Sequence, residues 1–444
     1  MKKLPLLLIF SALTLSSQAQ YRSEVWCPDQ GDGTYINPII NADYSDPDVC
    51  VGASGTDFYL TASSFNCIPG LPILHSKDLV NWEIIGHALT ELTPKDVFDK
   101  TAHGMGVWAP SIRYHNGEYY IYWGDPDYGV YMVKTKDPAG KWDDPVLVIA
   151  GEGMIDTTPL WDDDGRCYLV NGWAGSRAGF KSILSVRELS PDGTKAISDP
   201  VIVFDGNNEH RTVEGPKFYK HDGWYWIMAP AGGVPTGWQL AMRSKSPYGP
   251  YEHKIVLAQG KTNINGPHQG GWVHTAQGED WFLHFQDKGA YGRVVHLQPV
   301  NWVKGWPVMG KAKNGELCGE PVTRYKKPNV GKTYPIQNPV ESDEFNSVTL
   351  GKQWQWHSNY DQRYGQPTPY GFFRMYTHKL SDKFVNLWEA PNLLLQKTPA
   401  DSFTATAKIK FAAKKENQYG GIIMMGLDYS ALVVKRVGDK FQLQ

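Results

Sequence analysis

The stretch IDTTPLWDDDGRCYLVNGW, residues 155–173, contains a short strand-like run, a turn centred on Gly165 and a second run rich in aromatic and β-branched residues. This pattern is typical of two antiparallel strands joined by a tight turn. Four other stretches share the plan: SDPDVCVGASGTDFYLTAS (45–63), WAPSIRYHNGEYYIYWGD (108–125), EGPKFYKHDGWYWIMAP (214–230) and HQGGWVHTAQGEDWFLHFQD (268–287). The chain therefore contains a five-fold internal repeat, and a repeat of some tens of residues indicates a solenoid or a propeller.

Each repeat begins with a polar or tryptophan residue at a nearly constant distance from its turn glycine. Asp46, Trp108, Asp156 and Glu214 lie nine residues before that glycine, and His268 lies ten before it. These five residues follow one another at intervals of roughly 50–60 residues, about the length of a four-stranded propeller blade. No long apolar pattern of 3.6-residue period interrupts the region. We therefore predict an all-β protein in which residues 30–325 form a five-bladed β-propeller.

The first strand of each propeller blade lines the central axis, so residues at this repeated position should converge on one funnel. Taken singly, each has an ordinary structural explanation, such as a turn at Asp46-Pro47 or a hydrogen-bonded core histidine at His268. Carboxylates that are brought together repel one another and shift each other's pKa, so folds rarely keep them without a use. The joint placement of Asp46, Asp156 and Glu214 therefore predicts a functional site.

Three clustered carboxyl groups suit glycoside hydrolysis. That reaction needs a protonated carboxylic acid at the leaving oxygen and an ionised carboxylate that activates water. A third carboxylate beside the acid raises the acid's pKa by repulsion between like charges and so keeps it protonated. The 17 Trp and 24 Tyr residues supply flat surfaces on which sugar rings stack.

At these residues the chain resembles glycoside hydrolase family 43, a family of inverting, five-bladed enzymes that act mainly on arabinose- and xylose-containing polysaccharides. The resemblance runs from about Asn37 to the end, and its main motifs are Ser45-Asp46-Pro47, Ile155-Asp156 and Glu214-Gly215-Pro216. It implies that Asp46 is the general base, Glu214 the general acid and Asp156 the residue that modulates the pKa of the acid and orients it.

The resemblance also implies roles around the sugar. Trp108 and Phe65 would form walls of the pocket, and Arg293 would hydrogen-bond the terminal sugar. His268 resembles an axial histidine that also lies near the sugar and faces a hydrated structural calcium ion, although no oxygen-ligand motif of the EF-hand type predicts a metal independently. No cofactor is expected for the chemistry itself.

One departure from the family pattern leaves the base open. The motif usually reads Pro-Asp-Pro-Ser, whereas residues 45–48 read Ser-Asp-Pro-Asp. On a regular strand Asp48 would face the same side as Asp46, because side chains alternate with a period of two. Asp48 is therefore a competitor for the role of base.

The two ends of the sequence carry their own signals. Residues 1–19 combine Lys2 and Lys3, an apolar run and a small-residue cleavage site, which predicts a signal peptide and export to the periplasm or the extracellular space.

Residues 326–340 are expected to be a linker. Residues 341–444 resemble the concanavalin-like β-sandwich of xylosidase-type members but span about half of the expected length, so we expect the sequence to end within that domain. Residues 403–411 and 420–425 are predicted strands.

Charge and hydropathy argue against two classes of partner, nucleic acid and membrane, and leave carbohydrate as the expected partner. The net charge is −2, and no long run of Lys and Arg is present, which argues against nucleic acid as a partner. No stretch after the predicted signal peptide reaches the ~20 consecutive apolar residues that a membrane span requires.

The five cysteines are odd in number, so they cannot all pair within the chain. Cys50 and Cys67 could form a disulfide, or all five could be free thiols.

Two rival functions remain at this point. One is a retaining β-fructosidase on a similar propeller, although its expected Asn-Asp-Pro-Asn-Gly and Arg-Asp-Pro motifs are missing from the sequence. The other is a glycan-binding propeller without catalysis. Within family 43, the sequence does not separate α-L-arabinofuranosidase from β-D-xylosidase action, or exo from endo cleavage.

Overall fold

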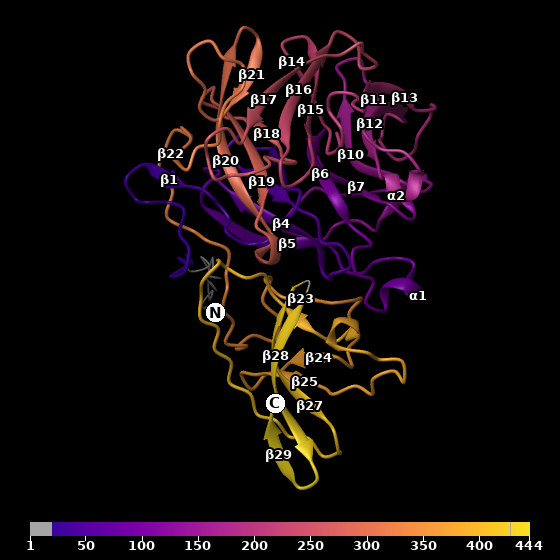
Figure 1. Ribbon diagram of the computed structural model, residues 1–444, viewed down its shortest axis with the longest axis vertical. Helices are drawn as coiled ribbons and strands as arrows, with labels where there is room; N and C mark the ends of the chain where they lie inside the picture. Colours follow the sequence, from indigo (N-terminus) through magenta and orange to yellow (C-terminus); the bar gives the residue numbers. More distant parts are fainter. Residues whose placement is uncertain (1–19, 427) are drawn as a thin grey trace, which may run out of the picture.

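A computed structural model describes residues 20–426 and 428–444, so the predicted signal peptide lies outside the described residues. The larger part of the molecule consists of five four-stranded antiparallel sheets, each formed by four consecutive strands (Figure 1). This arrangement confirms the predicted five-bladed propeller.

The blade strands follow one another along the chain without exchange between sheets. The first two blades contain β2 (Asp48–Val51), β3 (Phe58–Thr61), β4 (Gly70–Ser76), β5 (Trp82–Leu89), β6 (Trp108–His115), β7 (Glu118–Asp125), β8 (Gly129–Thr135) and β9 (Val146–Ala150). The third and fourth contain β10 (Met154–Trp161), β11 (Cys167–Trp173), β12 (Ile183–Leu189), β13 (Val201–Asp205), β14 (Lys217–His221), β15 (Trp224–Ala231), β16 (Trp238–Ser244) and β17 (Glu252–Ala258). The fifth contains β18 (Trp272–His274), β19 (Asp280–Asp287), β20 (Arg293–Val303) and β21 (Trp306–Met309). Helical turns are short: α1 (Lys95–Phe98), α2 (Gly175–Ala178), η1 (Gly289–Tyr291) and η2 (Leu387–Glu389).

The first strands of the blades surround the axis. Along this ring, β2 contacts β6, β6 contacts β10, β10 contacts β14, and β18 of the last blade contacts β2 of the first. The chain start also joins the last blade, because β1 (Thr34–Ile36) pairs with β22 (Arg324–Lys326) and the Asn37 side chain donates to the carbonyls of Leu297 and Val322. These contacts close the propeller.

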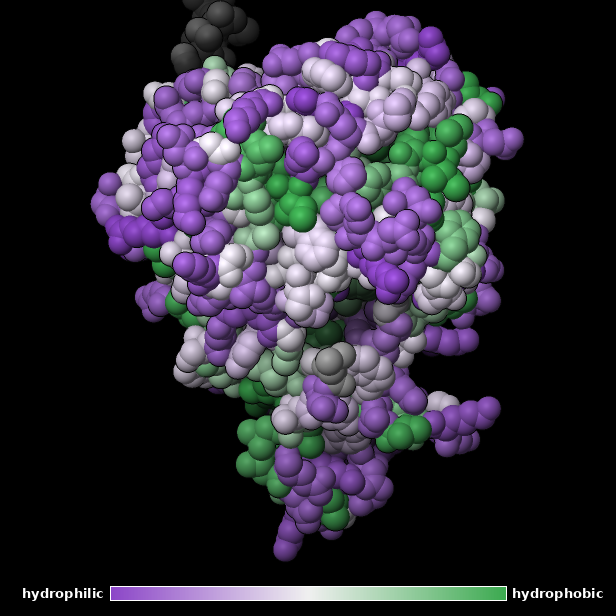
Figure 2. Space-filling view, turned by 45° about the horizontal axis from the view of Figure 1, so that its top comes forward, coloured by the Kyte–Doolittle hydropathy of each residue, from purple (hydrophilic) through white to green (hydrophobic). Residues whose placement is uncertain are grey.

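The hydrophobic core lies mostly between neighbouring blades. Ile73 of the first blade packs in one cluster with Ile121 of the second, and Leu184 of the third packs with Phe218 of the fourth. Each such side chain contributes about 1.5–3 kcal/mol when it is fully buried. All five cysteines are free thiols, so the Cys50–Cys67 disulfide is not formed. The space-filling view shows hydrophilic residues over most of the visible face, with hydrophobic patches among them (Figure 2).

Residues 341–444 form a second, smaller β-rich region below the propeller (Figure 1). Its strands are β23 (Gln355–Trp356), β24 (Gly365–Pro367), β25 (Phe373–Met375), β26 (Leu394–Leu395), β27 (Tyr419–Met425), β28 (Tyr429–Val437) and β29 (Lys440–Leu443). The strand predicted at 420–425 is present as β27, but the one predicted at 403–411 is wrong. That segment has no strand partner among the described residues, and its side chains are mostly exposed.

The second region docks on the loops of the first blade. The backbones of Ile68 and Trp356 exchange two hydrogen bonds, of 3.0 and 2.5 Å. The Asn359 side chain accepts from the Leu92 amide at 2.8 Å and donates to the Leu92 carbonyl and to Asp99, each at 2.9 Å. The loop that carries Phe65 is therefore held partly by the second region.

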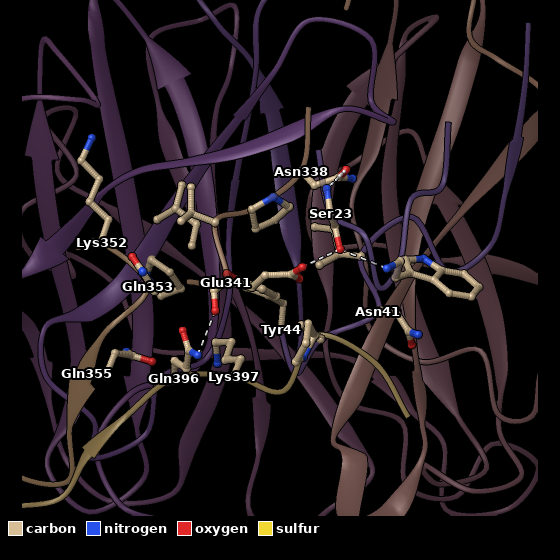
Figure 3. A pocket seen from close by; sticks show the side chains of 18 of the residues that line it. Ser23, Asn41, Tyr44, Asn338, Glu341, Lys352, Gln353, Gln355, Gln396 and Lys397 are labelled. Carbon is tan, nitrogen blue, oxygen red and sulfur yellow. Dashed lines mark hydrogen bonds between the residues drawn. The ribbon is translucent and has the colours of Figure 1, made fainter. Parts of the chain in front are cut away.

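A cleft with both polar and apolar lining residues lies where the N-terminal segment, the first blade and the second region meet (Figure 3). Ser23 donates to the Glu341 carboxylate at 2.7 Å, and the Gln396 side chain donates to the Glu341 carbonyl at 3.0 Å. None of the predicted site residues lines this cleft. Among the residues described, no helix is long and apolar enough to cross a membrane.

Candidate active site

Each blade begins with one residue in the left-handed region of backbone space. These residues are Asp46 (φ 55°), Ala109 (31°), Asp156 (58°), Gly215 (58°) and Gln269 (37°). In the first and third blades this residue is the one that the sequence repeat selected, Asp46 or Asp156. In the other three blades it directly follows the selected residue, which is Trp108, Glu214 or His268, so the predicted alignment of the repeats was wrong by one residue there. A left-handed non-glycine residue is strained by about 1–3 kcal/mol and is concentrated at functional sites. The fold therefore holds five left-handed turns at the mouth of one axis, and the four without glycine are strained.

Asp46 is buried and heavily hydrogen-bonded. Its Oδ1 accepts from Arg293 Nη1 at 3.0 Å, and its Oδ2 accepts from the hydroxyls of Ser45 and Ser63 at 2.8 and 2.7 Å. The surroundings of Asp46 therefore suit a base with a fixed orientation.

Asp156 and Glu214 lie side by side across the third and fourth blades. Asp156 Oδ2 accepts from the amide of Gly215 at 2.7 Å, directly after Glu214. Burial, together with the negative charges of Glu214 and Asp46, raises the pKa of Asp156 well above the usual range of an aspartic acid. The two neighbouring carboxyl groups can thus retain a proton at a pH where isolated ones would be ionised.

The Glu214 side chain is the more accessible of the two. It is 32 % exposed, whereas Asp156 is 2 % exposed as a residue. Glu214 Oε1 lies 2.9 Å from Nε2 of His268, which is fully buried. His268 therefore fixes one oxygen of Glu214, while the carboxyl group as a whole stays open to the funnel.

Asp48 occupies a different environment from Asp46. It is fully buried, and its Oδ2 accepts from Arg113 Nη1 at 2.6 Å and from the Ile112 amide at 2.9 Å. Both partners belong to the second blade. The left-handed conformation at Asp46 interrupts the strand alternation that would have placed the two aspartates on one side. Asp48 thus lies in an ion pair between blades and away from solvent.

Arg293 contacts the Asp46 carboxylate and also the residues that pack around it. Its Nη1 donates to Asp46 and, at 2.9 Å, to Ser45, and its guanidinium lies 4.7 Å from the centre of the Phe285 ring. Nη2 makes no hydrogen bond to any residue that the structure describes, so it remains available for a sugar hydroxyl.

Trp108 and Phe65 are brought together at one side of the funnel. Phe65 exchanges two backbone hydrogen bonds of 3.1 Å with Val107, the residue before Trp108. The Trp108 indole donates to the Gly104 carbonyl at 2.7 Å, and the Arg177 guanidinium lies 5.5 Å from the centre of its ring. Both aromatic side chains are half-buried, as a pocket wall requires.

Repeat analysis did not single out three polar residues that complete the site. Ser63 donates to Asp46 and accepts from the Ala109 amide at 2.8 Å, so it ties the Trp108 turn to the aspartate. Gln269 packs against Gly215, where an added Cβ would lie 2.7 Å from its Cγ. Lys217 is fully buried beneath the acids and donates to the Pro110 carbonyl at 3.2 Å. Lys217 and Gln269 directly follow residues that the sequence had singled out, which was the only signal for them, whereas Ser63 ends the first repeat, far from Asp46 in the sequence.

The chain matches two family models. "Glycosyl hydrolases family 43" covers residues 35–307, and "Beta xylosidase C-terminal Concanavalin A-like domain" covers residues 342–443. The chain belongs to glycoside hydrolase family 43. It is therefore an inverting glycosidase that acts on carbohydrate, built as a propeller followed by a concanavalin-like sandwich.

Relatives of known name cover most of this family 43 chain. It is 37 % identical to a putative β-xylosidase of Xylanibacter ruminicola, over 90 % of this chain and 72 % of that protein. It is 32 % identical to the non-reducing end α-L-arabinofuranosidase BoGH43B of Bacteroides ovatus, over 92 % and 77 %. A solved structure described as Bacteroides ovatus xyloglucan PUL GH43B superposes with a TM-score of 0.80 at 28 % identity and covers 92 % of this chain and 81 % of that one.

Proposed function

We propose that this family 43 enzyme releases xylose or arabinose residues from plant-type polysaccharides or oligosaccharides, as a β-D-xylosidase, an α-L-arabinofuranosidase or both. The observation that carries the proposal is the cluster of Asp46, Asp156 and Glu214, with Arg293 and His268 hydrogen-bonded to it. The similarity to proteins named for both activities supports this choice of sugars.

In the proposed reaction, Asp46 takes a proton from water as that water attacks the anomeric carbon. Three donors hold its carboxylate in one orientation, so the lone pairs left over point in a fixed direction. Attack from the face opposite the leaving group inverts the configuration in one step.

Glu214 gives its proton to the glycosidic oxygen in the same step. Asp156 cannot take this role, because its carboxyl group is buried and its Oδ2 already accepts from Gly215. Because two neighbouring carboxyl groups resist ionising together, Asp156 instead helps the pair to retain the proton that Glu214 donates. The hydrogen bond from the Gly215 amide to Asp156 fixes the turn that carries Glu214.

The test is a comparison of p-nitrophenyl β-D-xyloside and p-nitrophenyl α-L-arabinofuranoside with xylo- and arabino-oligosaccharides. Wild type should cleave at least one sugar class, and Glu214→Ala should lose roughly 10²–10⁴-fold in kcat on oligosaccharides. The loss should be much smaller on p-nitrophenyl glycosides, because p-nitrophenolate leaves without a proton.

Proton NMR of the first anomer formed distinguishes inversion from the retention of a β-fructosidase. No turnover of any glycoside by the folded wild-type protein would favour the glycan-binding alternative. Equal losses on both leaving-group classes would remove Glu214 from the acid role.

Two smaller proposals accompany the main one. His268 Nδ1 is buried and has no hydrogen-bond partner among the described residues, which fits a contact through water with a hydrated calcium ion. We propose that contact as structural; Ca²⁺ should then raise Tm of wild type after chelation, and His268→Gln should remove the effect. We also propose export, which N-terminal sequencing of the secreted protein tests by a start at Gln20.

A further inference from the structure

Three potential metal ligands lie together away from the active site, where the chain crosses from the third blade to the fourth. Glu209 and His210 belong to the crossing loop, residues 206–213, and His253 belongs to β17, the outer strand of the fourth blade. One ligand atom from each residue lies within 4.8 Å of the other two.

The two imidazole rings are held by packing against each other. Their centres lie 4.9 Å apart at an interplanar angle of 89°, and the Phe204 ring lies 5.2 Å from His253 and 6.1 Å from His210. His210 is buried, His253 is half-buried and Glu209 is exposed. The cluster therefore has one side formed by two packed histidines and another formed by an exposed carboxylate.

Hydrogen bonds do not explain why Glu209, His210 and His253 lie together. Within the part of the chain that the structure describes, neither the Glu209 carboxylate nor the His253 ring makes a side-chain hydrogen bond. Only His210 has a partner, because its Nδ1 accepts from the Trp238 indole at 3.3 Å. Two ligand side chains thus carry free lone pairs at short range.

We propose that Glu209, His210 and His253 bind one divalent transition-metal ion of the zinc class, with at least one coordination position open to water. Two imidazoles and one carboxylate form a ligand set that suits zinc, whereas calcium prefers six to eight oxygens. Ligands at about 2.0–2.2 Å around a tetrahedral ion lie about 3.3–3.6 Å apart. The three ligand atoms, now within 4.8 Å of one another, must therefore move closer together. Rotation of the exposed Glu209 side chain and a small shift of the two rings would bring them to that distance.

Binding should act on the loop that leads to the general acid. The His210 carbonyl accepts from the Val213 amide at 3.1 Å, and the Glu214 amide donates to the Pro230 carbonyl at 3.2 Å. An ion that joins His210 to β17 would therefore anchor loop 206–213 to the fourth blade at a point four residues before Glu214. The ion would stabilise this loop without touching the sugar.

The ion should also compete with Trp238. Because His210 Nδ1 accepts from the indole, Nε2 carries the proton in the neutral ring. An ion at Nδ1 would replace the indole donor, and an ion at Nε2 would move the proton to Nδ1, where the indole N–H could no longer donate. Either way the hydrogen bond is lost, so Trp238→Phe should bind the ion at least as tightly as wild type.

The experiment uses the full chain without an affinity tag, treated with a chelator and then titrated with Zn²⁺ by calorimetry and with Co²⁺ by visible absorption. Wild type should bind one equivalent of Zn²⁺ and give a Co²⁺ spectrum of low coordination number, and Zn²⁺ should raise its Tm. Glu209→Gln and His253→Gln should each lose at least about tenfold in affinity and lose the Tm shift.

A matched control is His115→Gln, which removes a half-buried histidine stacked on Trp161 at 4.5 Å and should bind Zn²⁺ like wild type. None of these substitutions touches the catalytic cluster, so turnover without metal should stay unchanged in all of them. Absence of Zn²⁺ binding by folded wild type, or wild-type binding by both Glu209→Gln and His253→Gln, would overturn the proposal. The calcium contact at His268 would be unaffected by either result.

Discussion

Asp46 and Asp48 are two residues apart and share one side-chain chemistry, yet they belong to different layers of the propeller. Asp46 belongs to the layer to which we assign catalysis; we call it the catalytic layer and define it as Asp46, Asp156 and Glu214. Asp48 belongs to the axial layer beneath it, defined as Asp48, Arg113 and Lys217. Asp46 contacts Arg293 of the fifth blade, whereas Asp48 contacts Arg113 of the second.

The two layers differ in how their charges are balanced. In the catalytic layer three carboxyl groups share one nearby guanidinium, and burial and repulsion raise the pKa of Asp156. In the axial layer one carboxylate faces two buried cations. We therefore expect the catalytic layer to lower the stability of the fold, as active sites often do, and the axial layer to contribute to that stability.

The largest expected effect is on stability and comes from Asp48→Asn. The substitution leaves the Arg113 guanidinium buried without its counter-charge, so the free energy of unfolding should fall by about 3–5 kcal/mol. Urea unfolding measures the loss, and kcat per folded molecule should stay close to wild type. A variant with normal stability and no activity would instead make Asp48 the base.

Asp156→Asn should have the opposite sign on stability. The folded protein holds a proton on Asp156 that the unfolded chain releases at about the ordinary pKa of an aspartic acid. Wild type therefore loses stability as pH rises from that value through the raised pKa of folded Asp156. The asparagine does not titrate and can still accept from Gly215.

The asparagine variant should therefore be more stable than wild type at pH 8, on the order of 1–2 kcal/mol, with the difference vanishing near pH 4. Its activity should fall, because Glu214 loses the neighbouring carboxyl group with which it retains a proton. Thermal unfolding at the two pH values measures the difference. Lower stability than wild type at both would show that Asp156 maintains the fold.

The fold and the three acids were readable from the sequence because both depend on local patterns. Hairpin signals at a fixed phase predicted the blades, and the placement of Asp46, Asp156 and Glu214 in that phase predicted the cluster. The left-handed turns were not readable, since Ala109 and Gln269 are not residues that favour positive φ. This explains the error of one residue in the phase.

The environment of Asp48 was also outside the reach of local patterns. Its partner Arg113 lies on another blade, so the ion pair depends on how blades dock and not on strand periodicity. The same holds for residues 403–411, whose sequence favours a strand but which have no partner strand among the described residues. In both cases the outcome depends on contacts between residues far apart in the sequence, which local patterns do not predict.

Ser63→Ala tests the support of Asp46 on a smaller scale. It removes one of three donors to Asp46 and leaves the Ala109 amide without its acceptor. A hydrogen bond to a charged group contributes about 1.5–3 kcal/mol, so kcat/KM should fall roughly 10- to 100-fold. Ser45→Ala is the matched control, because it removes a donor to Asp46 but leaves the Trp108 turn intact. Equal effects of the two would show that the link to Ala109 is irrelevant.

Lys217→Met should have the smallest effect and tests whether the two layers communicate. Lys217 is buried, and its positive charge lowers the pKa of Asp156 against the larger effects of burial and neighbouring acids. Removal of this charge should raise the pKa of Asp156 further and move the alkaline limb of the kcat profile upward by about half a pH unit. The maximal kcat should change little, because Lys217 does not reach the sugar. An unshifted profile would mean that the axial layer holds the blades together without influencing the proton on the acids above it.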